Sequence, residues 1–294
     1  MNDKLTLKTK LRQLYGIDSK HANYQNIPVF VQEALGYSET IDENWRGDTA
    51  RYQYILDHIA FADGVIVGDV GANTGFFTLS LAHAYPSSRF IAYESNPTHA
   101  QFIRQVADYF AMENVQVAAT AVDLQNAAHL PPHDILLHFN VLHHAGHDFD
   151  QVHVPSLADF DVYALNYLTR LRTAVSQSLV FQMGSNWGGQ KKSPIIGVKD
   201  DLEKLSYMAN LLTHSGWQII HVALATRDWQ QQIVYKNLSP DLVAIICHTP
   251  HQINPQQAQI LETKIAAYEL DQFPGEFYRR PLIICCPKNS DDER

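Results

Sequence analysis

The segment VIVGDVGANTGFF, residues 65–77, combines an apolar run that includes Gly68, an aspartate, two further glycines at Gly71 and Gly75, and two phenylalanines. The apolar run predicts a buried strand, and the residues after Gly75 predict the start of a helix. Glycines at such a junction let the backbone take positive φ angles and approach a ligand closely, while the first N–H groups of the helix have no partner within it. The segment therefore predicts a ligand-binding turn or, alternatively, a tight strand–helix turn without a ligand. Its spacing is not Gly-x-Gly-x-x-Gly, which disfavours a dinucleotide site.

An acidic residue follows the next strand-like segment, RFIAYESNP, where Glu94 comes directly after the apolar run. In open α/β sheets the ligand lies beyond the carboxyl ends of the strands, where a carboxylate can accept hydrogen bonds from the vicinal hydroxyls of a ribose. A carboxylate at this position can also simply neighbour the N-cap of the following helix. The glycine turn and the acidic residue together favour a ribose-containing ligand.

Several histidines lie close together after a further candidate strand, in the segment DILLHFNVLHHAGHD. A histidine with an ordinary pKa near 6.5 can take a proton from an acceptor at neutral pH. Three interpretations are open: a catalytic base at His143 or His144, histidines that only support the structure or position a substrate, or a divalent-metal site. The spacing matches no specific zinc signature, so we expect no metal. The metal interpretation would use His143, His144, His147 and Asp148, whereas His138 falls within the strand and is expected in the core.

Other candidate residues also follow predicted strands. Asn140 stands at the end of the strand that precedes the histidines, and we expect it to form a hydrogen bond with a bound ligand. His147 and Trp187 are candidate substrate contacts. Trp187 lies in the glycine-containing segment FQMGSNWGG, where its ring can swing over a ligand or, alternatively, pack beneath the loop.

The elements that position these residues alternate between strands and helices from Val65 onward. This alternation predicts a parallel sheet covered by helices on both faces. The predicted strands are 65–70, 89–93, 115–119, 134–139 and 178–183, and the predicted helices are 75–84, 97–110 and 157–176. A helix at about 199–213, a strand at 217–224, a segment at 238–250 that fits a helix or a strand, a helix at 255–269 and a last strand, RPLIICCPK, complete a set of seven strands.

The first sixty residues have a helical pattern instead. Leu7, Leu11, Leu14 and Tyr15 recur at helical spacing. A short helix is predicted between Pro28 and Gly36, and another is predicted to be capped by Asp48 or Thr49 and to end near Gly64. We therefore expect a helical appendage or lid at 1–60 and a Rossmann-like domain at 61–294.

The composition narrows the class of protein. The chain has 294 residues and a formal net charge of -9, which disfavours the phosphate attraction used by nucleic-acid binders. Its three cysteines, two of them adjacent, indicate reduced thiols rather than a disulfide framework. The N-terminal segment lacks the apolar core of a signal peptide, and no apolar run is long enough to span a membrane. We expect a soluble cytoplasmic protein with a small-molecule substrate, and the sequence carries no indication of its oligomeric state.

The stretch VIVGDVGANTGFFTLSLAHAYPSSRFIAYESNP resembles motifs I and II of class I S-adenosylmethionine-dependent methyltransferases, and the likeness covers about residues 65–184. The resemblance implies a seven-stranded Rossmann-like sheet and S-adenosyl-L-methionine as the cofactor. It implies that the glycine turn contacts the methionine part of the cofactor, that Asp69 interacts with its amino group, that Glu94 binds its ribose, and that Asp123 and Val122 meet its adenine. Asp123 could equally cap the next helix. With Ser95 beside Glu94 and with Asn140 at its strand end, the candidate cofactor-binding residues are Asp69, Gly71, Ala72, Asn73, Gly75, Glu94, Ser95, Asp123 and Asn140.

Within that class, the segment up to Asn96–Pro97 is most similar to FkbM-type O-methyltransferases. The Lys-x-Asp-x-Glu-Gly segment of that group is replaced by DILLHFNVLHHAGHD, whose Val-Leu-His-His resembles other class I enzymes, including the carboxymethyl transferase of tRNA wobble uridine. ENWRGD at 43–48 also resembles a segment of that tRNA enzyme. Upstream residues are candidates for a lid in which an arginine or tyrosine meets the cofactor carboxylate, with surface salt bridging as the alternative for Arg46. They are Trp45, Arg46, Arg51 and Tyr52.

These observations predict a methyltransferase that methylates a hydroxyl group of a small metabolite, sugar or natural product. Two alternatives are an RNA-directed methyl- or carboxymethyl-transferase and a catalytically inactive cofactor-binding regulatory protein. A nicotinamide-dependent dehydrogenase is disfavoured by the glycine spacing.

Overall fold

The computed structural model describes residues 2–16, 26–36, 47–195, 201–247, 254–273 and 276–288, and the chain forms two compact units, Met1–Val122 and Asp123–Arg294. Each unit is described by itself. Trp45 and Arg46, two of the candidate lid residues, lie outside the described residues. No helix in the described part of the chain is long and apolar enough to cross a membrane.

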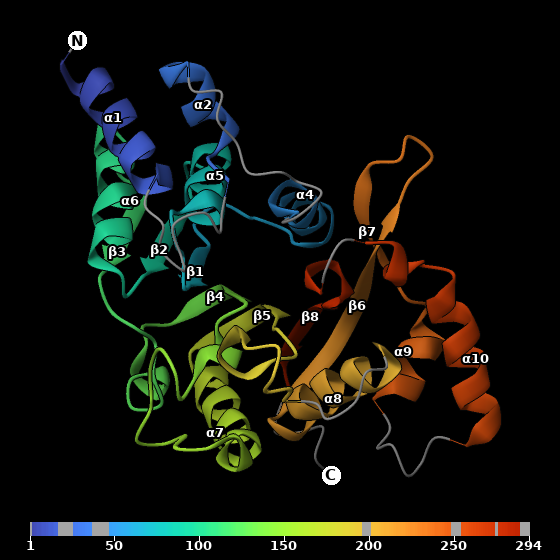
Figure 1. Ribbon diagram of the computed structural model, residues 1–294. Helices are drawn as coiled ribbons and strands as arrows, with labels where there is room; N and C mark the ends of the chain where they lie inside the picture. Colours follow the sequence, from blue (N-terminus) through green and yellow to red (C-terminus); the bar gives the residue numbers. More distant parts are fainter. Residues whose placement is uncertain are drawn as a thin grey trace. The chain divides into compact units, whose positions relative to one another are not determined.

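The first unit contains three parallel strands in the order β3-β2-β1 (Figure 1). Val70 pairs with Tyr93 and Tyr93 pairs with Ala118, so the carboxyl ends of all three strands meet at one edge. The residues that follow β1 and β2 are therefore neighbours at that edge. In chain order the elements are α1 (Asn2–Gly16), α2 (Val29–Leu35), α4 (Asp48–His58), β1 (Ile66–Val70), α5 (Phe76–Ala84), β2 (Arg89–Tyr93), α6 (Pro97–Tyr109) and β3 (Val115–Ala118).

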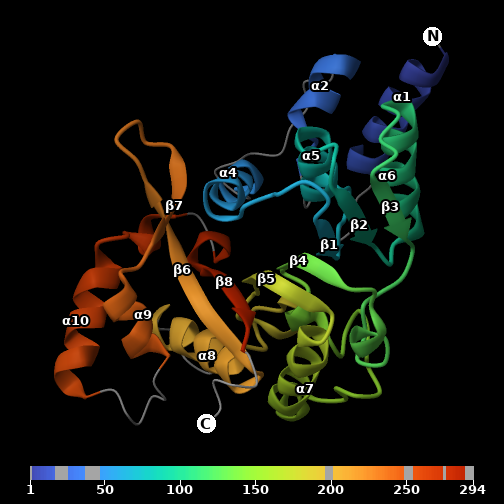
Figure 2. The same ribbon diagram turned by 180° about the vertical axis from the view of Figure 1, so that it is seen from behind.

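The N-terminal helices share a hydrophobic core with the strands and helices that follow them. Leu7 and Leu11 lie four residues apart, hence on one face of α1, and both are buried. They belong to the same apolar cluster as Val31 of α2 and Phe102 and Val106 of α6, and α1 runs alongside α6 in both views (Figures 1 and 2). The division of the chain at residue 60 stays a prediction, but α1 and α2 contribute directly to the core of the first unit.

The helix boundaries in this unit follow local chemistry. Pro28 precedes α2 and Gly36 ends it in the left-handed region, as predicted. Asn96 caps α6 by accepting bonds from the N–H groups of Thr98 and His99. Both expectations for α4 are wrong. Gly47 occupies the N-cap position, so Asp48 and Thr49 already belong to the helix, and the helix stops at His58 because Ile59 takes an extended conformation that leads the chain toward β1.

The second unit holds five strands in the order β4-β5-β8-β6-β7. β4 and β5 are parallel, whereas β8 lies between β5 and β6 and is antiparallel to both. β6 and β7 form a hairpin whose far end extends away from the neighbouring helices (Figures 1 and 2). The elements are β4 (His133–Phe139), α7 (Phe160–Arg172), β5 (Val175–Gln182), α8 (Asp201–His214), β6 (Trp217–Arg227), β7 (Ile233–Asn237), α9 (Pro240–Ile246), α10 (Pro255–Ala266) and β8 (Leu282–Pro287).

The described residues therefore contain eight strands rather than the expected seven. The missing strand is β7, which is short and whose sequence, IVYKN, carries polar residues at its end. The ambiguous segment at 238–250 contains the helix α9, with Ser239 at the N-cap position and Pro240 in the first turn. The long helix predicted at 157–176 begins as a 3₁₀ turn at Leu157–Asp159 and ends at Arg172, since β5 starts early at Val175.

We expect Leu11→Ala to lower the free energy of unfolding by about 2–5 kcal/mol, because it leaves a cavity in the core of the first unit. Leu5→Ala on the same helix is the matched control, since Leu5 is 69% exposed and its truncation should change stability by less than about 0.5 kcal/mol. Urea unfolding followed by circular dichroism measures both. Equally small effects would show that α1 does not belong to this core.

Candidate functional site

The glycine turn after β1 is bent by three residues with positive φ angles: Gly71 at 69°, Asn73 at 53° and Gly75 at 83°. The N–H groups of Gly71 and Ala72 both donate to the carbonyl oxygen of Tyr93, at 2.9 and 3.1 Å, which ties the turn to the end of β2. A side chain at Gly75 would come within 2.8 Å of Ile103 on α6. Gly75 is therefore required by the close approach of α6 as well as by its φ angle.

Glu94 lies at the end of β2 and joins the turn to the next helix. Its Oε2 accepts a hydrogen bond from the N–H of Asn73 and its Oε1 accepts one from the N–H of Asn96, both at 2.7 Å. The residue is only 7% exposed, and burial raises the pKa of its carboxyl to about 7 against the opposing effect of these two bonds. Its neighbour Ser95 is exposed.

Asp69, the penultimate residue of β1, is a second buried carboxylate. Its Oδ2 accepts a hydrogen bond of 2.7 Å from the hydroxyl of Thr78 on α5. Burial raises the pKa of Asp69 to about 6, although the Thr78 bonds and the positive charge of Arg51 act in the opposite direction. The sequence interpretation missed Thr78, because a threonine inside a helix carries no motif.

Arg51 is held in the same unit by buried partners. It forms an ion pair with Asp48, whose other carboxylate oxygen accepts a 2.7 Å bond from the N–H of Asn26. Its guanidinium lies 5.0 Å from the centre of the Phe77 ring at the start of α5. Tyr52 instead packs on α5, where its hydroxyl donates to the carbonyl of Ser80 at 3.4 Å. The structure thus places the charge of Arg51, rather than the hydroxyl of Tyr52, in reach of Asp69.

One buried group in the glycine turn has no partner among the described residues. The hydroxyl of Thr74 is buried, and its Oγ1 makes no hydrogen bond. A buried hydroxyl without a partner costs free energy, and a ligand with a polar group can supply the missing bond. The turn, Thr74 and the two carboxylates fit a ligand that carries positive charge and hydroxyl donors.

In the second unit, Asp123 stabilises a turn. Its Oδ1 accepts bonds from the N–H groups of Gln125 and Asn126, at 3.0 and 2.9 Å, just before a 3₁₀ turn at Ala127–His129. The N-cap position of that 3₁₀ turn belongs to Asn126, so the expectation that Asp123 could cap the next helix is wrong. Contact of Asp123 with a ligand stays a prediction, and so does contact of Val122, which is buried at the end of the first unit.

Asn140 follows β4 with a φ angle of 59° and belongs to a polar network. Its Nδ2 donates to Oε1 of Gln182 at 3.1 Å, and its Oδ1 accepts from Nη1 of Arg280 at 2.8 Å. The fully buried Gln182 bonds in turn to the hydroxyl of Tyr235 and to the carbonyl of Arg280. Gln182, Tyr235 and Arg280 were missed as site residues, since Tyr235 lies on the missed strand β7 and Arg280 comes to the site from a segment far away in the chain.

The adjacent residues His143 and His144 differ in their surroundings. Their ring centres are 4.2 Å apart. His143 is buried, and its Nδ1 accepts a 3.2 Å hydrogen bond from the N–H of Gly184. Nδ1 of the partly exposed His144 lies 2.9 Å from Oδ2 of Asp148, although the ring N–H does not point along the line to that oxygen.

These contacts favour different neutral tautomers for the two rings. His143 carries its proton on Nε2, because Nδ1 is an acceptor, so its Nε2 can donate but cannot take a proton. The carboxylate of Asp148 favours a proton on Nδ1 of His144, which leaves Nε2 of His144 as the basic nitrogen.

His147 and Trp187 pack against one another, with ring centres 4.3 Å apart. Nε1 of Trp187 donates to the carbonyl of Ala145 at 2.6 Å, and a side chain at Gly188 would overlap the His147 ring. Trp187 is therefore packed within its loop, as in the second of the two alternatives, and its contact with a substrate stays a prediction. The most exposed tryptophan in the described chain is Trp229, which is 86% exposed in the β6–β7 hairpin.

No group of three or more histidine, cysteine, aspartate or glutamate side chains in the described ranges could hold a metal ion. His138 lies in the core, as expected. Its Nε2 is 3.2 Å from the hydroxyl of Tyr167, its Nδ1 has no partner among the described residues, and burial lowers the pKa of its ring to about 4.

No known protein family and no curated protein sequence matches this chain. Solved structures do resemble it. The bifunctional kinase-methyltransferase WbdD matches with a TM-score of 0.51 at 16% sequence identity, covering 94% of this chain and 68% of that chain. Monomeric WbdD matches with a TM-score of 0.50 at 13% identity, covering 93% and 72%. The O-methyltransferase of a trans-AT PKS multienzyme from Brevibacillus brevis has a TM-score of 0.45 at 10% identity, covering 81% and 71%.

The fold is Rossmann-like and resembles that of methyltransferases. At these identities the likeness concerns the fold alone. The similarity to FkbM-type enzymes in particular finds no support among these structures and rests on the sequence of the glycine turn.

His138 should make the stability of the protein depend on pH. The ring is held neutral in the folded state with a pKa of about 4, whereas the unfolded chain has the ordinary value of 6.5. The unfolded state therefore binds more protons below pH 6.5, so this stabilisation is complete above pH 6.5 and is lost as the pH falls toward 4. At pH 5 the loss should amount to about 2 kcal/mol relative to pH 8.

The comparison is between wild type and His138→Phe, by urea unfolding at pH 8 and pH 5. The variant should lose less stability on acidification, whatever its stability at pH 8. Identical losses would contradict the assignment of a neutral buried ring.

Proposed function

We propose that the protein is an S-adenosylmethionine-dependent methyltransferase that methylates a hydroxyl group of a small metabolite, sugar or natural product. The observation that carries the proposal is the hydrogen bond between Glu94 and Asn73, which joins the acid at the end of β2 to the glycine turn after β1. These are the two sequence motifs that resemble the methyltransferase class. The Rossmann-like fold and its similarity to the kinase-methyltransferase WbdD support the same proposal.

The residues of the first unit fit this cofactor. S-adenosylmethionine, when bound, supplies an electrophilic methyl group on a positively charged sulfur. Glu94 would accept hydrogen bonds from the ribose hydroxyls, and Asp69 would accept one from the amino group. Arg51 would bind the carboxylate of the cofactor. The hydroxyl of Thr74, which makes no hydrogen bond to the described residues, would form one with the cofactor. Two buried carboxylates with raised pKa values are costly in the free protein, and a cationic ligand offsets that cost.

The second unit offers one basic nitrogen for the acceptor proton. In the proposed reaction Nε2 of His144 takes the proton of the acceptor hydroxyl while Asp148 stabilises the imidazolium that forms. The Nε2–H of His143 donates a hydrogen bond and fixes the orientation of the acceptor. His147 and Trp187 would bound the acceptor without exchanging protons.

The first test is cofactor binding and its dependence on pH. S-adenosylhomocysteine should bind and raise the melting temperature. Its affinity should rise by up to about tenfold between pH 6 and pH 8, because Glu94 loses its proton near pH 7 and only the carboxylate accepts from both ribose hydroxyls. Glu94→Gln should weaken binding by about 1.5–3 kcal/mol and should remove most of this pH dependence. Titration calorimetry at several pH values measures the affinity of both proteins for S-adenosylhomocysteine. Failure of the wild type to bind this ligand at millimolar concentration would overturn the proposal.

The second test concerns the base. His144→Gln should lower the rate of the chemical step by about 10²–10⁴-fold and leave cofactor affinity within a few-fold. His143→Gln keeps a donor on its side-chain nitrogen and should cost far less. Single-turnover rates with an acceptor found by screening hydroxylated metabolites measure both. A larger loss for His143→Gln would reverse the two roles, and cofactor binding without transfer to any acceptor would favour the binding protein.

A further inference from the structure

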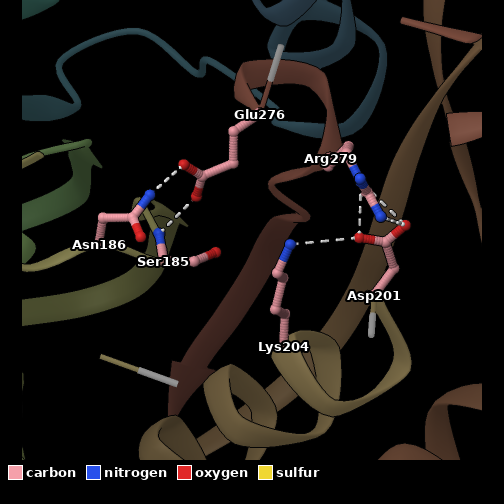
Figure 3. A network of polar contacts seen from close by, with 6 residues as sticks. All are labelled: Ser185, Asn186, Asp201, Lys204, Glu276 and Arg279. Carbon is pink, nitrogen blue, oxygen red and sulfur yellow. Dashed lines mark hydrogen bonds and ion pairs between the residues drawn. The ribbon is translucent and has the colours of Figure 1, made fainter. Parts of the chain in front are cut away.

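A cluster of charged side chains gathers where the first turn of α8 meets the segment before β8 (Figure 3). Asp201 forms a two-pronged ion pair with Arg279, with Nε at 2.8 and 3.0 Å and Nη2 at 2.7 Å from its carboxylate oxygens. Lys204, one turn further along α8, places its Nζ 3.5 Å from Oδ1 of the same aspartate. Both cations therefore share one carboxylate.

Lys204 is the incompletely satisfied member of the cluster. It is only 8% exposed, and its ammonium makes a single hydrogen bond within the described residues, the long one to Asp201. An ammonium group has three donors. Removing such a group from water without filling its donors is costly, and the cost is offset when an anion completes its shell.

Glu276 connects this cluster to the loop that follows β5. Its two carboxylate oxygens accept from the N–H of Ser185 at 2.9 Å and from Nδ2 of Asn186 at 2.5 Å (Figure 3). Burial alone would raise the pKa of Glu276, but the charge of Arg280, the Ser185 bonds and the charge of Lys204 hold that pKa below its usual value. Both carboxylate oxygens of Glu276 therefore already accept hydrogen bonds from the loop after β5.

The same loop joins the cluster to the histidines. Gly184 directly precedes Ser185, and a Cβ atom on Gly184 would lie 2.7 Å from Nε2 of His143 and 3.0 Å from Cζ of Arg280. The ring of His143 and the guanidinium of Arg280 thus both lie against the backbone of Gly184. The loop that Glu276 holds through Ser185 is therefore in direct contact with His143.

The charges of the cluster favour an anion. The cations are Lys204, Arg279 and Arg280, and the carboxylates within the cluster are Asp201 and Glu276. Asp271 also acts on Arg279, but it is exposed to water, which screens its charge. The three cations outnumber the two carboxylates that are not exposed to water, so an additional negative group beside Lys204 would be favoured, in a chain whose formal net charge is -9.

We infer that Lys204 anchors an anion-binding subsite and that the acceptor of the proposed reaction carries a carboxylate or phosphate group. The statement that the bound molecule is the methyl acceptor rests on the proposed function, whereas the anion-binding subsite itself is inferred from the surroundings of Lys204. The anionic group binds Lys204, and the adjoining part of the molecule extends toward the loop that contacts His143. The bound anion forms charge-assisted hydrogen bonds with the ammonium, which makes a single long one to the described residues. The group that accepts the methyl remains a hydroxyl.

The direct test uses inorganic phosphate and acetate as probes, at constant ionic strength against chloride. At least one of the two should raise the melting temperature of the wild type, and the stronger of them identifies the preferred group. Lys204→Gln should lower the affinity of the protein for the preferred anion at least tenfold, whereas Lys204→Arg should retain anion binding. Lys264→Gln, at an exposed lysine on α10, is the matched control and should behave as wild type. No response to either anion, or equal responses in Lys204→Gln and wild type, would overturn the inference.

Lys204→Met separates anion binding from a purely structural role. Without an anion, this variant should melt at or above the wild-type temperature, because it removes an incompletely bonded buried charge, and phosphate or acetate should no longer stabilise it. A variant that melts far below wild type in every buffer would show that Lys204 serves the fold, and would contradict the subsite.

A final comparison distinguishes this inference from the proposed function. S-adenosylhomocysteine should bind Lys204→Gln as tightly as wild type. If it binds neither protein while the anion response stands, the proposed function fails and the subsite survives. Conversely, with labelled S-adenosylmethionine, wild type should methylate phosphorylated or carboxylated alcohols at least tenfold faster than their neutral counterparts, and Lys204→Gln should lose that preference. If wild type methylates neutral and anionic alcohols at equal rates, the inference about the acceptor is wrong while the proposed function stands.

Discussion

The buried carboxylate of Glu94 is the constraint on which the first unit depends. It satisfies one backbone N–H in the turn after β1 and one at the start of α6, so two connections that leave neighbouring strands are held by a single side chain. Both N–H groups lie where regular strand and helix bonds have ended, and leaving them unpaired in the interior would be costly. The same burial that makes these bonds necessary raises the pKa of the carboxyl to about 7. The shape of the turn and the raised pKa of Glu94 therefore have a common cause.

In the second unit, the residues at the carboxyl ends of the strands are held together by amide and guanidinium side chains instead of a carboxylate. Asn140 follows β4 in a left-handed conformation, and Gln182 ends β5 beside it. Arg280 bonds to both from the segment before β8, which starts at the edge where β5 ends because the two strands are antiparallel. The insertion of an antiparallel strand beside β5 thus brings a distant basic segment to the carboxyl ends of β4 and β5. Without that topology Arg280 and Glu276 could not reach the loop that carries Gly184 and Ser185.

Most of the fold could be predicted from the sequence, because its signals are local. β2 occupies the predicted residues 89–93, and the capping residues Asn96 and Pro97 place the start of α6 correctly. The prediction failed at the start of β5, where polar residues form part of the strand. β5 begins with Val175 and continues with Ser176 and Gln177, whose side chains hydrogen-bond to Asp134 of β4. Because these residues are polar, the sequence pattern placed the start of the strand three residues too late.

The site could be predicted only as far as its motifs extend. The glycine turn and Glu94 are recognisable from spacing, whereas Thr78 and Arg280 become relevant through contacts with residues far away in the chain. The two adjacent histidines illustrate the remaining limit. A sequence assigns them the same side chain and the same ordinary pKa, yet one accepts a backbone N–H on Nδ1 and the other faces a carboxylate there. Which nitrogen is basic follows from these partners and not from the residue type. The catalytic proposal thus depends on Gly184 and Asp148 as much as on the histidines themselves.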